Sequence, residues 1–212
     1  MNSLLYSLLG LSRLIDKLNE FVGRHVSWLV LAAVVVSAVN AVVRKAFNTS
    51  SNAFLEVQWY FFAGIFLLGA GYTMLRQEHV RIDVILSRFA RPTQVKVEIF
   101  GILVFLFPLV WTVITLVTPL VIQAIQSGEM SSNAGGLIRW PVYALVPAGF
   151  ALLGLQGISE LIKRLAFLEG LCDDPGEKKH DKSAEEELAE AILAAEAAKL
   201  RADGAAAQGG QK

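Results

Sequence analysis

The sequence predicts an all-α, polytopic membrane protein with four transmembrane helices, an N-terminal amphipathic helix and a soluble C-terminal helical tail. The chain is 54% hydrophobic and 18% charged, and its mean hydropathy is +0.51. Soluble domains average about 45–50% apolar and about 25% charged residues. The excess lies in four apolar blocks, each long enough to cross a hydrocarbon core of about 30 Å. Charged and aromatic residues gather at the block ends, as at a membrane–water interface.

Residues 1–24 carry apolar side chains at helical spacing, with charged side chains on the other side. An amphipathic helix of this kind lies in the membrane interface or packs on a partner. It is not a cleavable signal peptide, because its charges are mixed and the next apolar run leads into further spans. The apolar face is Leu4, Leu8, Leu11, Ile15, Leu18 and Val22, widened by Leu5, Leu14 and Phe21, and the polar face is Arg13, Asp16, Lys17, Glu20 and Arg24.

The first span is predicted at about residues 25–43. Ala33, Ser37, Asn40 and Arg44 share one face of it. Small residues allow close helix contact, and an amide in lipid needs a partner, so this face suits helix packing. Asn40 lining a substrate path is the alternative. Packing is favoured because no other polar group clusters with this amide.

The second span is predicted at about residues 56–75. Glu56 and Trp59 stand at its start, where a carboxylate can reach headgroups or a partner and an aromatic ring anchors the interface. Residues 51–53 are expected to cap this helix. Charged residues follow the apolar body at once, beginning with Arg76.

A basic segment, residues 76–96, connects the second and third spans. Its His79-Val80-Arg81-Ile82-Asp83 run alternates polar and apolar residues, which indicates a short extended or interfacial stretch. The alternative reading is a helix end with solvated charges. An apolar side later in this segment predicts a short surface helix ended by Pro92.

The third and fourth spans are predicted at about residues 97–122 and 141–161. The third would be roughly 39 Å long at 1.5 Å per residue, so it must tilt or project beyond the bilayer. Glycine and serine mark residues 123–140 as a loop. Arg139, Trp140 and Pro141 then anchor the fourth span, with proline in its first turn.

Residues 173–212 have the composition of a soluble segment. Pro175 and Gly176 break the chain, and Ser183 and Glu186 have capping-box spacing before an Ala- and Glu-rich stretch. We expect a helical tail that is partly disordered.

Lys and Arg residues near the spans predict the orientation. Ten lie on one side of the membrane and three on the other, so the positive-inside rule places both termini in the cytoplasm. The ten are Arg13, Lys17, Arg24, Arg76, Arg81, Arg88, Arg91, Lys96, Lys163 and Arg164, and the three are Arg44, Lys45 and Arg139.

Several function classes are disfavoured by the residues. The formal net charge is zero, which argues against nucleic-acid binding. No phosphate-binding loop or H-E-x-x-H zinc motif occurs, and Cys172 is the single cysteine. His25, His79 and His180 lack ligand spacing, so no catalytic, cofactor or metal site is expected. Between their flanks the spans carry no Asp, Glu, Lys or Arg, which favours a helper subunit over a transporter with its own site.

Several elements resemble the small membrane subunit of tripartite ATP-independent periplasmic (TRAP) transporters, the DctQ-like family. They are Glu56 with Trp59, the Gly69-Ala70-Gly71 cluster, Arg76, the His79-Val80-Arg81-x-Asp83 run and Arg139-Trp140-Pro141. The resemblance covers roughly residues 21–164.

The resemblance implies a four-helix subunit in a bacterial inner membrane that scaffolds a large DctM-like permease subunit. That partner would carry the substrate and sodium sites. A periplasmic binding protein would deliver an organic acid, and ion gradients, not ATP, would drive its import. By this similarity, Glu56, Trp59, Arg76, His79, Arg81 and Asp83 fix helix ends and interface contacts. The 123–140 loop, with residues 48–54, would face the binding protein. A stand-alone scaffold or assembly factor for another complex is the alternative, and a small membrane enzyme is a weaker one.

Overall fold

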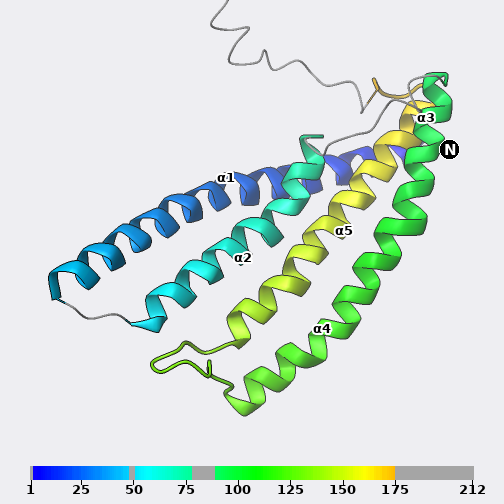
Figure 1. Cartoon of the computed structure of the whole chain (residues 1–212). Helices are drawn as coiled ribbons and strands as arrows, with labels where there is room; N and C mark the ends of the chain where they lie inside the picture. The colour runs from blue at the N-terminus through cyan, green and yellow to red at the C-terminus, as the bar shows by residue number, and fades with distance from the viewer. Residues whose placement is uncertain (1, 48–50, 78–88, 175–212) are drawn as a thin grey trace, which may run out of the picture. The chain divides into compact units, whose positions relative to one another are not determined.

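The computed structural model describes residues 2–47, 51–77 and 89–174, with side chains from Tyr6 onward. The unit Gly176–Lys212 lies outside these residues, so the helical tail stays a prediction. Four described helices are long and apolar enough to cross a membrane, which confirms the predicted fold class. The elements are α1 (Asn2–Phe47), α2 (Asn52–Leu75), α3 (Arg91–Gly101), the π-helical turn η2 (Ile102–Leu106), α4 (Phe107–Ser127) and α5 (Trp140–Leu168) (Figure 1).

Helix α1 is a single uninterrupted helix over the segments predicted as an amphipathic arm and a first span. The expected apolar face of the arm is largely outward: Leu14 is 65% exposed and Phe21 is 62% exposed. The face turned toward the other helices instead carries buried polar groups, among them Ser12 and Asn19. That the apolar face lies in the membrane interface or packs on a partner stays a prediction. Where the arm ends and the span begins stays a prediction.

The boundaries of α2 follow the sequence signals. The Ser51 hydroxyl accepts a hydrogen bond from the Ala53 amide, so the predicted N-cap is confirmed. The helix ends at Leu75, and Gln77 takes a positive φ of 56° just after it. That conformation turns the chain out of the helix.

The third apolar helix is longer than predicted, because α3, η2 and α4 run on without a break over Arg91–Ser127. Pro92 lies in the first turn of α3. Proline fits there because the first-turn amides have no partner within the helix. The short surface helix predicted before Pro92 falls on residues 78–88, outside the described residues. The π-turn lies directly before Pro108, whose missing N–H and bulky ring disturb regular α-helical bonding.

Gly128, at φ 62°, ends α4, and α5 begins at Trp140 with Pro141 in its first turn, as predicted. Residues 128–139 form a hairpin loop with an antiparallel bridge between Met130 and Ile138. We call this side of the helices the hairpin end. The opposite side, where α2 ends and α3 begins, is called the α2–α3 end.

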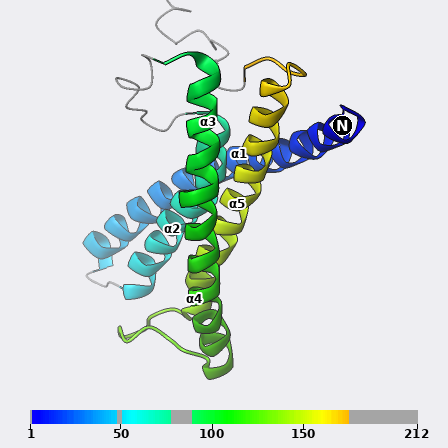
Figure 2. The same cartoon turned by 90° about the vertical axis from the view of Figure 1, so that its right-hand side faces the viewer.

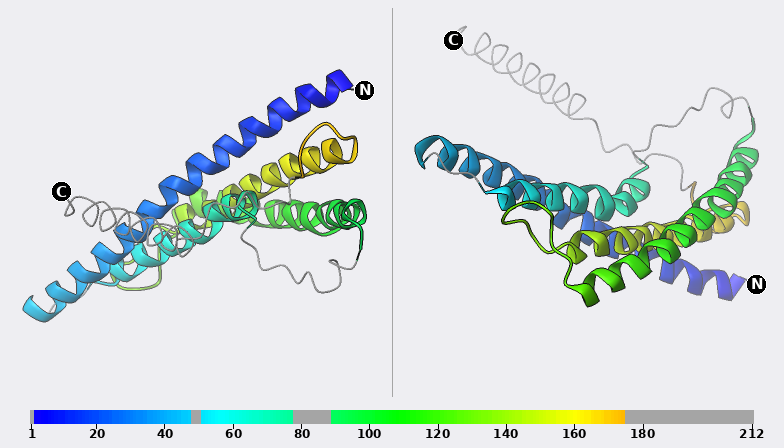
Figure 3. Two further views of the ribbon diagram at one scale, coloured as in Figure 1. Left: turned by 90° about the horizontal axis from the view of Figure 1, so that it is seen from above. Right: turned by 60° about the horizontal axis from the view of Figure 1, so that its bottom comes forward.

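Helix α5 is the centre of the packing, since it contacts α1, α2, α3 and α4. Helices α1 and α2 lie side by side, and α4 lies along the other side of α5 (Figures 1 and 2). The N-terminal half of α1 crosses the C-terminal half of α5 (Figure 3). The most apolar window of α5 is 39% buried, whereas the corresponding windows of the other three helices are each 11% buried. Most of the apolar surface therefore points outward.

Close contact between α2 and α5 depends on Gly149. A Cβ placed on this residue would lie 2.5 Å from the backbone oxygen of Leu67. The missing side chain lets the two backbones approach, which is how small residues serve helix pairs in membranes.

Candidate functional site

A buried polar network joins α1, α3 and α5 at the α2–α3 end. We call it the cross-helix network. It is made by Ser12, Asp16, Asn19, Gln77, Glu98, Gln156, Ser159, Glu160, Lys163 and Arg164.

Gln156 is the hub between α1 and α5, and it is fully buried. Its amide nitrogen donates to the Asp16 carboxylate at 2.9 Å and to Glu160 at 3.2 Å. Its amide oxygen accepts from the Asn19 Nδ2 at 2.9 Å. One amide thus uses both of its polar ends to hold the crossing of the two helices.

Ser12 of α1 and Ser159 of α5 also meet at this crossing, and both are buried. Their hydroxyl oxygens lie 2.7 Å apart. The Ser159 hydroxyl also reaches the Asp16 carboxylate at 2.6 Å. Small hydroxyl residues at a crossing permit close approach and supply hydrogen bonds at once.

Glu160 is the most completely surrounded carboxylate of the network, with its side chain 1% exposed. It accepts from the Gln77 amide at 3.1 Å and from Gln156. It also pairs with Lys163 and Arg164 on its own helix. A buried carboxylate persists only when cations and hydrogen bonds replace its lost hydration. Glu160 has both.

Arg164 of α5 connects the network to α3, the start of the third apolar helix. Its guanidinium, 3% exposed, donates to the Glu98 carboxylate of α3 at 2.8 Å. Arg91, also on α3, pairs in turn with Asp174 beyond α5, with one of its nitrogens 2.7 Å from the carboxylate. These contacts tie the start of α3 to the end of α5.

Asn19 keeps one unsatisfied atom, its buried Oδ1. A Cβ on Gly71 of α2 would lie 2.3 Å from that oxygen, so only glycine leaves room for the amide.

A second polar cluster, the Glu56 site, lies at the hairpin end. Glu56 is 4% exposed. Its carboxylate accepts from the Leu137 amide at 2.6 Å, from the Asn133 side chain at 2.8 Å and from the Ser131 hydroxyl. One side chain of α2 therefore binds the hairpin loop at three points.

The hairpin loop is also closed by its own backbone. The Ser131 amide donates to the Leu137 carbonyl at 2.8 Å, and the Arg139 amide donates to the Glu129 carbonyl at 3.0 Å. A Cβ on Gly136 would meet the Ser131 side chain at 2.4 Å, so the turn requires glycine there. Contacts within this chain therefore form the loop conformation without a partner.

Further contacts attach this loop to α2 and α5. The Tyr60 hydroxyl donates to the Ile138 carbonyl at 2.7 Å. Arg139 pairs with Glu129 at 3.2 Å and donates to the Tyr143 hydroxyl at 3.3 Å, and the contact with Tyr143 raises the pKa of Arg139. A cavity of about 280 Å³ lies among Glu56, Trp59, Arg139, Tyr143 and their neighbours.

The ionisable side chains at the centre of both clusters are paired within this chain. In the described part of the chain, no group of three or more His, Cys, Asp or Glu side chains is placed to hold a metal ion. The three buried ionisable side chains there, Glu56, Glu160 and Arg164, all have partners. Both clusters are therefore arranged to hold helices and a loop in place.

Comparison with known families decides the class of protein. A family model described as "Tripartite ATP-independent periplasmic transporters, DctQ component" matches residues 31–167. The chain belongs to this family. It is thus the small membrane subunit of a TRAP transporter of the bacterial inner membrane, in a family that functions with a DctM large subunit and a periplasmic binding protein. The family is a transporter component and is not known as an enzyme. Neither the curated proteins nor the solved structures contain a significant match.

The predicted site residues of this DctQ-family chain are spread over both ends. Glu56 is buried in the hairpin contacts, whereas Trp59 is 64% and Trp140 is 39% exposed. Arg76 pairs with Glu20 of α1 at 2.9 Å and stacks over the Tyr72 ring. Pro141 starts α5 beside Arg139. The predicted residues His79, Arg81 and Asp83 lie outside the described residues.

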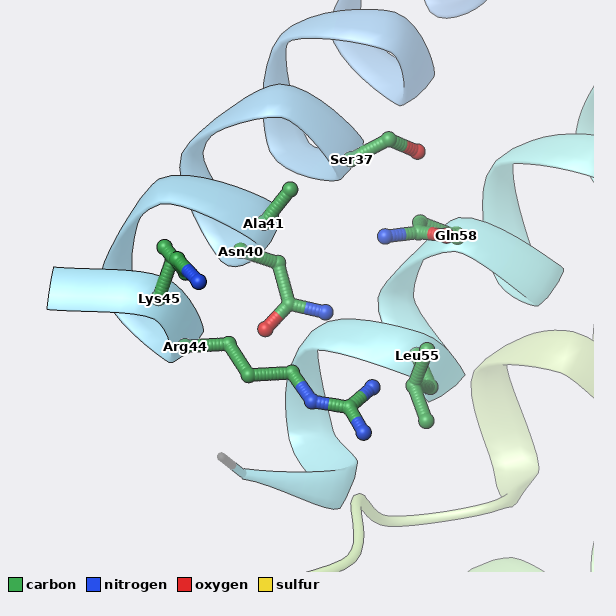
Figure 4. A pocket seen from close by; sticks show the side chains of 7 residues that line it. All are labelled: Ser37, Asn40, Ala41, Arg44, Lys45, Leu55 and Gln58. Atoms are coloured by element: carbon green, nitrogen blue, oxygen red, sulfur yellow. The ribbon is translucent and has the colours of Figure 1, made fainter. Parts of the chain in front are cut away.

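Asn40 lies on the face of α1 that is turned toward α2. Its Oδ1 is buried and has no hydrogen-bond partner among the described residues. It lines a pocket between α1 and α2 at the hairpin end (Figure 4).

The cross-helix network is the main feature that sequence reasoning missed in this DctQ-family chain. The sequence pattern puts Asp16 on the polar face of the arm, and it predicts spans without Asp, Glu, Lys or Arg between their flanks. A signal was available: Gln156, Ser159, Glu160 and Lys163 follow one another at helical spacing of three or four, so one face of the span is polar. A polar stripe in an apolar helix indicates a buried contact.

Proposed function

We propose that this small subunit scaffolds the large permease subunit of a sodium-driven TRAP importer of an organic acid, with its hairpin loop directed to the binding protein. The observation that carries the proposal is the outward apolar surface. Three of the four apolar helices bury 11% of their most apolar window within this chain. Such faces need lipid or another apolar helix surface to cover them.

The paired charges support a scaffold without its own transport site. A coupling ion needs oxygen ligands that are free to bind it, usually near the membrane midplane. The buried carboxylates among the described residues, Glu56 and Glu160, are already satisfied by this chain. On this proposal the sodium sites are in the large subunit.

The shaped hairpin loop supports a docking role. Three hydrogen bonds that the Glu56 carboxylate accepts hold it, and exposed Trp59 and Trp140 flank it. A preformed loop loses little conformational entropy when a partner binds. We further propose that both termini are cytoplasmic, which places this loop in the periplasm.

Site-specific photo-crosslinking tests both contacts in the assembled transporter. A crosslinker is placed at Trp28 of α1, Phe66 of α2 or Trp111 of α4, which are 67%, 78% and 73% exposed, and separately at Ser132 in the loop. We expect the large subunit to be captured from at least one helix face and the binding protein from Ser132. An assembled complex with no capture from any helix face would contradict the scaffold role. A reporter fused after Gly128 should be periplasmic; a cytoplasmic reporter would refute the orientation.

Sodium coupling and the substrate class need a separate measurement. Purified complex in liposomes, with the binding protein added, should take up an organic acid only when an inward sodium gradient is imposed. Uptake driven equally by a potassium gradient would refute the coupling ion and leave the scaffold role standing.

A further inference from the structure

The third apolar helix has too few main-chain donors at its π-turn. In η2 the Phe107 amide donates to the Ile102 carbonyl, which lies five residues back instead of four. Pro108 follows at once and has no N–H to donate. The carbonyls of residues 103–105 are therefore short of at least one amide donor.

The threonine hydroxyls of this helix serve other carbonyls. Thr115 donates to the Trp111 carbonyl at 2.8 Å, and Thr118 donates to the Ile114 carbonyl at 2.6 Å. Both contacts lie after the turn, so they do not replace the donor that proline removes.

The turn faces away from the other helices. Its inner side, with Ile102 buried, packs on α5, which runs along one side of this helix (Figures 1 and 2). The side chains of residues 103–105 are 45–69% exposed. A helix carbonyl points toward the residue four positions on, so the Val104 carbonyl points toward Pro108, which is exposed. The missing donor therefore affects the outer side of the helix.

The turn also lies far from water. Pro108 is near the middle of the apolar helix Arg91–Ser127, roughly 25 Å from either end at 1.5 Å per residue. A hydrocarbon core is about 30 Å thick, and it offers neither water nor any other donor to a carbonyl at this depth. The surface therefore favours a protein partner over acyl chains.

Gly101, directly before the turn, is an independent observation. Glycine inside a helix is less favourable than alanine, so it usually has a packing reason. Gly149 has one within this chain, because its Cβ would meet the Leu67 backbone, whereas a Cβ at Gly101 would meet nothing within 4 Å. The space beside Gly101 is thus open to the backbone of a helix from another chain.

We propose that a helix of the large permease subunit packs on this surface, the η2 face, which comprises Gly101, residues 103–105 and Pro108. Its backbone approaches Gly101, and one of its Ser, Thr, Asn or Gln side chains donates to a carbonyl of residues 103–105. These side chains are donors that membrane helices use in their contacts. The inference rests on the proposed scaffold role and adds the face and the chemistry of the contact.

A second copy of this chain does not fit the η2 face. Two copies in one orientation would meet at equal depth around a two-fold axis. Residues 101–109 read GILVFLFPL, so none of their side chains carries a donor. A copy would thus bring the same unmet carbonyls and no donor, which is why the occupant has to be a different subunit.

Photo-crosslinking in the assembled transporter tests the face. A crosslinker replaces Phe105, which is 69% exposed, and in a separate sample Phe66 of α2, which is 78% exposed. We expect the large subunit to be captured from Phe105, whether or not Phe66 also reacts. Capture from Phe66 without capture from Phe105 would overturn the inference and leave the scaffold role standing. Capture of a second copy from Phe105 would also overturn it.

A bulkier residue tests the close approach. Gly101→Leu should reduce recovery of the large subunit about tenfold without lowering the stability of this chain, because the added side chain meets open space. Gly10→Leu is the matched control, since a Cβ there also meets nothing within 4 Å, and its recovery should equal that of the native chain. Native recovery with Gly101→Leu, or equal losses in the two variants, would overturn the close approach.

Returning the amide tests the hydrogen bond. Pro108→Ala gives the carbonyls a donor within the helix, so the large subunit should bind about fivefold more weakly in a detergent titration. Pro119→Ala is the control, because Pro119 is an exposed proline inside the same helix but outside the π-turn, and it should leave binding unchanged. Native affinity with Pro108→Ala would overturn the hydrogen bond. Equal weakening in both variants would mean that the prolines act through the shape of the helix, which also overturns it.

Discussion

The Gln156 amide of α5 lies 2.9 Å from the Asp16 carboxylate of α1, although 140 positions separate the two residues in the sequence. The bond fixes where the long first helix crosses the central fifth one. It is part of a network that holds the N-terminal half of α1, which packs few of its apolar side chains against the other helices. The crossing therefore depends on polar contacts.

A double-mutant cycle should detect this coupling. Asp16→Ala and Gln156→Ala each remove the bond. The double variant should therefore lose less unfolding free energy than the two single variants added together, and we expect this difference, the coupling energy, to be about 1 kcal/mol. Unfolding in mixed detergent micelles, followed by tryptophan fluorescence, gives the three free energies. A cycle with Arg13→Ala in place of Asp16→Ala, on the same helix but exposed, should be additive. Additivity in both cycles would show that the bond carries no coupling.

Glu160→Gln should destabilise the protein more than any single hydrogen-bond loss. Removing one partner of a buried ion pair leaves an uncompensated charge, at a cost of about 3–5 kcal/mol. We expect about 3 kcal/mol, at the lower limit, because Lys163 still pairs with Asp16 and Arg164 still pairs with Glu98. The same micelle unfolding measures it. Glu169→Gln, an exposed carboxylate just after α5, is the control, and an equal effect in both variants would contradict the prediction.

Glu56→Gln should loosen the hairpin loop without unfolding the helices. The amide keeps the size of the carboxylate but loses acceptor capacity for Ser131, Asn133 and the Leu137 amide. Each weakened charge-assisted bond contributes about 1–3 kcal/mol. Hydrogen exchange of peptides covering residues 129–139 should therefore become faster. Glu129→Gln, which removes a carboxylate that is 40% exposed, should change exchange less, and equal acceleration would argue against a special role for Glu56.

Gly149→Ala should separate α2 from α5. The new Cβ would meet the Leu67 backbone oxygen at 2.5 Å, and backbone cannot move aside as a flexible side chain can. Overpacking of this kind costs about 1–3 kcal/mol. Gly101→Ala is a matched helical control with nothing within 4 Å of its Cβ, and it should be neutral or stabilising by up to about 1 kcal/mol. Equal melting temperatures for the two variants would refute the close-contact role.

Cys172 should react slowly with iodoacetamide at neutral pH. Partial burial, followed by the nearby charges of Asp173 and Asp174, raises the pKa of this thiol. A raised pKa lowers the thiolate fraction below the unperturbed value, so the alkylation rate should rise only at higher pH than for a free cysteine. The rate against pH, with the denatured chain as reference, measures the shift. Asp173→Asn should move the profile back toward lower pH, and coincident folded and denatured profiles would contradict the prediction.

The sequence alone determined the four apolar helices, the Ser51 cap and the proline at the start of α5. These are local properties: hydropathy, helix length and capping chemistry act over a few neighbouring residues. It also singled out Glu56 and placed it correctly at a helix start. It could not show that this carboxylate binds the hairpin loop, because the loop residues are 75 to 81 positions away.

Tertiary structure decided which face of each helix is buried. The sequence predicted that the apolar face of the N-terminal arm, with Leu14 and Phe21, lies in the membrane interface or packs on a partner. It did not show that Asp16, on the polar face, meets α5. Around membrane helices the surroundings are as apolar as leucine, so burying apolar side chains gains little, while an unpaired polar group in lipid is costly. Asp16, Asn19, Gln156 and Glu160 therefore meet one another inside the protein, and the leucines and aromatic rings remain outside for lipid or a partner subunit.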